Sequence, residues 1–167
     1  EILLVPTGYW ARGVLVKKQF EEGLQRIREV RARLEEEGFT AGAWMSSTMG
    51  HGFEILRHPY RRMKGSQGQL LGNTICPLDR AWLRYIKWCV ERLAQTGVKS
   101  ILLDDDFRID NHGGSAFESN NGCFCELHLA EFEKRYRRGL DREELVKILD
   151  KPLPLSLNGK RVRHDWL

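Results

Sequence analysis

Short apolar segments that alternate with amphipathic ones constrain the fold of this chain most strongly. Three segments hold nearly continuous apolar runs that predict buried strands, at 2–6, 39–46 and 99–106. Runs of this kind are typical of parallel sheets, whose strands are covered on both faces. Because helical segments separate them, the sequence predicts an α/β fold of parallel β/α units, with functional groups at the carboxyl ends of the strands.

Four segments show a helical period, over 18–37, 80–96, 126–137 and 142–150. Gly38 follows the first segment as a natural C-terminal stop. Asp79 precedes the second segment and is suited to be its N-cap. Asp141 and Glu144 have the spacing of a capping box at the start of the fourth. Residues 47–75 show no clear period, so we expect a long functional or mobile loop there.

The composition fits one globular domain that does not enter a membrane. The chain has 167 residues, of which 41% are hydrophobic, and no apolar run approaches the ~20 residues that span a bilayer. The net charge of +4 is modest and its basic clusters lie near acids or on helix faces, so we do not expect nucleic-acid binding. Four cysteines are too few for a disulfide scaffold, which indicates a reducing, cytoplasmic compartment.

The spacing of the cysteines predicts a metal site. Cys123 and Cys125 are too close in sequence for an easy mutual disulfide. Together with His128 they form a C-x-C-x-x-H segment, and thiolate and imidazole ligands suit tetrahedral Zn²⁺. Either Cys76 or His112 would supply the fourth ligand. The alternative is that the cysteines are buried thiols. We expect this for Cys89, which lies on the apolar face of the second predicted helix.

Three consecutive aspartates, Asp104, Asp105 and Asp106, end the third predicted strand. Side chains alternate along a strand, so the first and third share one face. Repulsion among adjacent carboxylates raises at least one pKa, which suits a general acid. The same oxygens would suit Mg²⁺ or Ca²⁺. The structural alternative is that they cap backbone N–H groups and pair with Arg108.

The segment from Cys76 to Tyr136 resembles the zinc-bearing β-galactosidases of glycoside hydrolase family 42 and looser glycosidase relatives with a barrel fold. The Cys76–Pro77 pair matches the family's CP motif, and residues 98–107 (VKSILLDDDF) lie over its catalytic strand. The family's C-x-C-x-x-C segment and following helical Phe lie over Cys123, Cys125, His128 and Phe132. The resemblance is good over this segment and covers residues 1–75 in outline.

The resemblance implies roles for individual residues, with two departures. Asp105 and Asp106 stand where the family has Asn and Glu, and His128 stands where it has the last Cys. By position, Asp106 would be the general acid/base, while Asp104 or Asp105 would orient it or bind a sugar hydroxyl. A structural zinc ion would have Cys76 as its fourth ligand. The shorter Asp side chain argues against β-galactosidase specificity but not against a carbohydrate substrate.

The resemblance also implies that the three strands are the second to fourth of a TIM (β/α)8 barrel. Residues 1–150 would then form a partial barrel with a zinc loop at 108–128, and residues 151–167 a connector or tail. Such barrels have about 250 residues, and this chain begins with Glu1. We therefore expect a fragment of a longer enzyme, inactive or nearly so alone, with the partner carboxylate on the rest of the polypeptide.

Carbohydrate binding would draw on side chains near the strand ends. An aromatic ring such as Trp10 stacks on the apolar face of a sugar. The other candidate substrate-binding residues are His51, Arg108 and Asn111. Two alternatives stay open: a non-catalytic carbohydrate-binding relative, and a metal-dependent hydrolase that uses the three aspartates as ligands. Self-association into a homo-oligomer also stays open.

Overall fold

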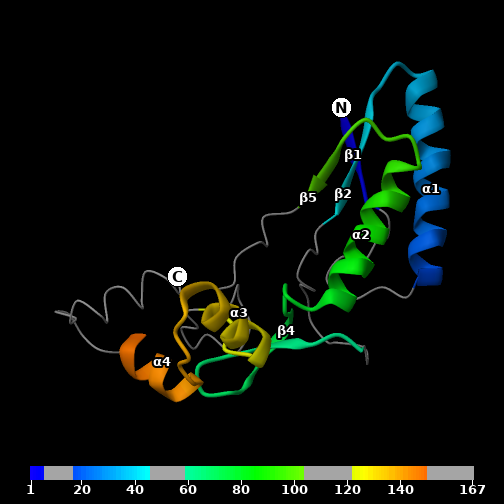
Figure 1. Cartoon of the computed structure of the whole chain (residues 1–167). Helices are drawn as coiled ribbons and strands as arrows, with labels where there is room; N and C mark the ends of the chain where they lie inside the picture. The colour runs from blue at the N-terminus through cyan, green and yellow to red at the C-terminus, as the bar shows by residue number, and fades with distance from the viewer. Residues whose placement is uncertain (6–16, 46–58, 104–121, 150–167) are drawn as a thin grey trace.

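The computed structural model describes residues 1–5, 17–45, 59–103 and 122–149 and shows a mixed α/β chain (Figure 1). The strands are β1 (Ile2–Leu4), β2 (Ala41–Met45), β3 (Arg62–Lys64), β4 (Leu70–Ile75) and β5 (Ile101–Leu103), and the helices are α1 (Lys17–Glu36), α2 (Arg80–Ala94), α3 (Glu126–Tyr136) and α4 (Arg142–Leu149). Within these ranges, no helix is both long enough and apolar enough to cross a membrane.

The strands β1, β2 and β5 form a parallel sheet in that order, which confirms the predicted parallel β/α units. In this sheet Ile2 pairs with Ala41, and Ala43 pairs with Ile101. The strands follow one another across the sheet without a reversal of order. Helix α1 connects the first pair, and α2 precedes β5, so the sheet is built from successive strand–helix steps.

Both helices, α1 and α2, pack on the same face of this sheet (Figure 1). The main core that they form with β2 and the end of β4 contains Phe20, Leu24, Ile27, Ala43, Met45, Ile75, Trp82, Tyr85, Cys89 and Leu93. Leu4 and Ile101 of the outer strands pack against it. The burial of Cys89 here confirms that this cysteine is a core residue. One shared core on one face of the sheet is the arrangement that consecutive right-handed β/α crossovers produce.

Strands β3 and β4 form an antiparallel hairpin, so the prediction of a loop throughout residues 47–75 was wrong for its second half. The Gly65 N–H donates to the Gln69 carbonyl at 2.8 Å, and Gly68 closes the turn with a φ of +81°, which favours glycine. Met63 is buried between two half-buried basic side chains. An alternation of one apolar and two basic residues over so short a strand is too weak to be recognised as a β pattern.

The predicted helix ends are confirmed where local capping determines them. The Asp79 carboxylate accepts hydrogen bonds from the backbone N–H groups of Ala81 and Trp82 at the start of α2. Before α4, the Glu144 N–H donates to the Asp141 carboxylate at 2.8 Å, and the Asp141 N–H donates back to the Glu144 carboxylate at 3.1 Å. This reciprocal pair is the capping box that the sequence predicts.

Candidate metal centre

Four side chains from two distant segments meet beside the hairpin: Cys76, Cys123, Cys125 and His128. Their ligand atoms all lie within 4.8 Å of one another. The three cysteines are fully buried and reduced, and the histidine is half-buried. This cluster could hold a metal ion, and it is the set of ligands that the spacing and the resemblance together predict.

The separations among the ligand atoms of Cys76, Cys125 and His128 match the edges of a metal-centred tetrahedron. Cys76 Sγ lies 3.6 Å from Cys125 Sγ, and His128 Nδ1 lies 3.5 Å from the first sulfur and 3.4 Å from the second. With Zn–S bonds of about 2.3 Å and a Zn–N bond of about 2.0 Å, the S–S edges are about 3.8 Å and the S–N edges about 3.5 Å. The two sulfurs are also much too far apart for a disulfide bond, which is about 2.05 Å long.

Cys76 reaches the cluster because a tight turn follows β4. The Cys76 carbonyl accepts a hydrogen bond from the Asp79 N–H at 3.0 Å, which closes a four-residue turn. Pro77 occupies the second position of this turn, where its fixed φ is favourable. Asp79 then caps α2. The CP pair therefore has a local structural reason: it turns the chain out of the hairpin, past the ligand position and into a helix.

The other ligands are placed by the start of α3. Cys125 is the N-cap of this helix, where the helix dipole favours a thiolate. The His128 N–H donates to the Cys125 carbonyl at 3.0 Å, so the histidine lies one turn further on the same side. The C-x-C-x-x-H spacing thus brings three of the ligands together at the start of a single helix.

Mutual hydrogen bonds within the cluster shift the pKa values of its members in opposite directions. Hydrogen bonds with Cys123 and Cys76 hold the pKa of Cys125 well below the ordinary thiol value, and hydrogen bonds with Cys123 and Cys125 raise the pKa of Cys76. Burial lowers the pKa of His128, but hydrogen bonds to both neighbouring cysteines and their charges outweigh it and raise this pKa to about 9. Cys76 and His128 therefore carry protons that an incoming metal ion would displace.

The cluster is surrounded by a few apolar side chains, and an exposed ion-pair bridge lies beside it. Met63 and Leu71 of the hairpin complete the small core that contains the three cysteines. Glu126, directly after the N-cap of α3, pairs with Arg61 Nη1 at 2.8 Å and also with Lys64 Nζ. The hydrogen bond from Lys64 lowers the pKa of Glu126. From the sequence we expect the basic clusters to lie near acids or on helix faces, but this bridge is not predicted.

The structure brings together the four predicted metal ligands, with Cys76 in the fourth position. The competing ligand His112 lies outside the described residues. The predicted catalytic and substrate-binding residues also lie outside them: Asp104, Asp105, Asp106, Trp10, His51, Arg108 and Asn111. Strand β5 does end at Leu103, directly before the three aspartates in the sequence. Their proposed roles stay predictions.

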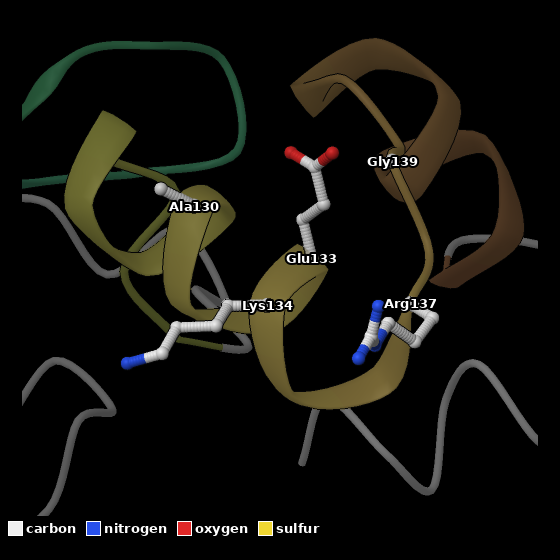
Figure 2. Close-up of a pocket in the computed structure, with 5 residues that line it drawn as sticks. All are labelled: Ala130, Glu133, Lys134, Arg137 and Gly139. Carbon is white, nitrogen blue, oxygen red and sulfur yellow. The ribbon is translucent and has the colours of Figure 1, made fainter.

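A pocket of about 600 Å³ lies elsewhere, at the C-terminal end of α3 (Figure 2). Its described lining consists of Ala130, Glu133, Lys134, Arg137 and Gly139. Glu133 reaches toward the turn that carries Gly139, whereas Lys134 extends away from it (Figure 2). Ligand sites require polar groups that converge, and these exposed charged groups diverge. We therefore assign the functional site to the cysteine–histidine cluster.

Comparison with family models, curated proteins and solved structures finds no match to this chain.

Proposed function

We propose that the chain binds a structural Zn²⁺ ion through Cys76, Cys123, Cys125 and His128. The observation that carries this proposal is the geometry of the cluster: one S–S and two S–N separations among Cys76, Cys125 and His128 agree with the edges of a zinc-centred tetrahedron, and Cys123 Sγ lies within 4.8 Å of all three. Soft thiolate ligands with one imidazole favour zinc over the hard cations Mg²⁺ and Ca²⁺. A reducing, cytoplasmic compartment would keep the thiols available.

Four protein ligands support a structural role for this ion. Catalytic zinc sites have three protein ligands and keep an open position for water or substrate, whereas closed sites have four. The three thiols are fully buried, which leaves little room for a substrate at the metal. When bound, the ion would cross-link the end of the hairpin to the start of α3. The surrounding residues hold the two segments in the required positions.

Elemental analysis of the purified protein tests the zinc proposal. We expect about one zinc ion per chain in the wild type and little or none in Cys123→Ser. Cys89→Ala is the matched control, because this cysteine is buried in the main core and should leave the zinc content unchanged. A wild-type protein without zinc and with four titratable thiols would contradict the proposal.

We further propose that this zinc site belongs to a glycoside hydrolase of the (β/α)8-barrel type. Two observations support it: α1 and α2 cover the same face of a parallel sheet, and three aspartates follow the carboxyl end of β5 in the sequence. Active sites of barrels lie at the carboxyl ends of the strands. Asp106 would then be the general acid/base, and Asp104 or Asp105 would orient it or bind a sugar hydroxyl.

Hydrolysis of aryl glycosides tests this second proposal. The assay needs the longer polypeptide, which would also contain the partner carboxylate. Asp106→Asn should lower kcat by about 10²–10⁴ while the far-UV spectrum and zinc content stay unchanged. Unchanged turnover would remove Asp106 from the mechanism. Sugar binding without hydrolysis would favour a non-catalytic relative. Loss of activity on mild chelation, restored by Mg²⁺, would favour a metal-dependent hydrolase that uses the aspartates as ligands.

A further inference from the structure

An ion-pair bridge joins the start of α3, beside three of the candidate ligands, to the β3 side of the hairpin, whose backbone pairs with the fourth ligand, Cys76. Glu126 lies at the first position of α3, directly after the ligand Cys125. Its carboxylate contacts Arg61 Nη1 at 2.8 Å through one oxygen and Lys64 Nζ through the other. Arg61 directly precedes β3, and Lys64 is the last residue of this strand. One exposed carboxylate therefore pairs with two basic side chains on the β3 side of the hairpin.

The same two basic residues also hold the ligand segments through their backbones. The Arg61 carbonyl accepts a hydrogen bond from the N–H of the ligand Cys76 at 2.8 Å. The Lys64 carbonyl accepts one from the N–H of Phe124, which lies between the other two ligand cysteines, also at 2.8 Å. Each basic residue thus contacts a ligand segment with its backbone and Glu126 with its side chain.

The charges of the bridge and of a filled metal site are complementary. Three thiolates around Zn²⁺ carry a net charge of −1, because the imidazole ligand is neutral. Glu126 with its two cations carries a net charge of +1. The bridge is exposed, with the Glu126 side chain at 62% of full exposure, so its electrostatic effect is screened by solvent. We therefore expect the bridge to act mainly through its position, because it holds the start of α3 against the hairpin, and less through its charge.

We propose that Glu126 is a positioning residue of the metal centre, which holds the start of α3 against β3 so that the four ligands are assembled before the metal ion binds. This inference rests on the proposed zinc site. Groups outside the ligand shell that orient the ligands raise metal affinity, because less ordering is required on binding. The bridge would act in this way by orienting the backbone segments near the ligands, rather than by contacting a single ligand side chain.

Substitution of Glu126 by glutamine tests this role, because the shape is kept and the charge removed. We expect Glu126→Gln to weaken Zn²⁺ binding about three- to tenfold, as two exposed ion pairs allow, in competition with a chromophoric chelator. Glu131→Gln is the matched control, since Glu131 lies on the same helix and pairs with Lys134 at 3.7 Å. This variant should bind zinc like the wild type.

Two further readouts separate positioning from other effects. If Arg61 and Lys64 acted by charge alone, removing Glu126 would leave two cations that favour thiolates, and zinc binding would become tighter. Positioning predicts weaker binding, and high salt should bring the wild type close to Glu126→Gln by screening the bridge. Equal or tighter binding by Glu126→Gln, with wild-type zinc binding intact, would overturn the inference. A wild type that binds no zinc would overturn the zinc proposal instead.

Discussion

Removal of the metal ion is expected to release α3 and α4 from the hairpin while the main core stays folded. The perturbation is chelation of the zinc-loaded protein, with Cys125→Ser as its genetic equivalent. Cys125 is fully buried and close to two other ligands, with Cys76 Sγ at 3.6 Å and His128 Nδ1 at 3.4 Å. Serine keeps the size of the side chain but lacks the thiolate, so the ligand set is broken with little change in packing.

The composition of the small core around the cluster and of the main core determines the size of this effect. In the small core around the cluster, Met63 and Leu71 are the buried side chains that are not ligands. Their burial contributes about 1.5–3 kcal/mol each. A zinc ion at a thousand times its Kd contributes about 4 kcal/mol, and structural sites bind with about 10–16 kcal/mol in total. The ion therefore matches or exceeds the apolar contribution here, whereas the ten buried residues of the main core include no candidate ligand.

Hydrogen exchange measured by mass spectrometry resolves the two regions. Amides of β3, β4, α3 and α4 should lose protection in the metal-free protein, and amides of α1 and α2 should keep it. Helices α3 and α4 have 11 and 8 residues and share a small apolar core of Phe124, Phe132, Leu145 and Leu149, so once detached they have little to support them and part of the helical far-UV signal should also fall. Cys89→Ala should retain zinc and the protection of α3. Unchanged protection across α3 and α4 without metal would refute this reasoning, and so would equal loss everywhere.

Three further substitutions test the packing and charge of the described elements. Leu24→Ala should lower the free energy of unfolding by about 2–5 kcal/mol in urea without changing zinc content, because Leu24 is fully buried in the main core; a change below 1 kcal/mol would contradict its burial. Asp141→Ala should cost about 1 kcal/mol and speed amide exchange in α4, and unchanged exchange would argue against the capping box. The hydrogen bond from Arg92 lowers the pKa of Glu21 below 4.5, so this pair stabilises the fold above that pH and the stabilisation is lost as the pH falls through the lowered value. Glu21→Gln should therefore lower the urea midpoint at neutral pH and leave it unchanged in strong acid, and equal effects at both would contradict the pairing.

Features determined by neighbouring residues could be predicted from the sequence. The N-cap at Asp79 and the capping box of Asp141 and Glu144 each act within one helical turn, so their residue types and spacing suffice. The same holds for most of the metal centre. Cys125 is an N-cap and His128 lies one turn on, so the C-x-C-x-x-H spacing brings its ligands together wherever a helix begins there. The hairpin could not be predicted, because β3 has three residues and Met63 is its one apolar side chain.

The fourth ligand and the bridge depend on how distant segments meet, which local patterns do not record. Cys76 and Cys125 are 49 positions apart, and Arg61 and Glu126 are 65 positions apart. Such pairs form because Ile75 is anchored in the main core, so the next residue must turn at a defined place beside the hairpin. A bound metal ion would add a cross-link at that turn. Glu126, two residues before His128, adds another between α3 and the hairpin. If the bridge forms without metal, the ligand segments meet before the ion arrives, and zinc then closes a site that the chain has already assembled.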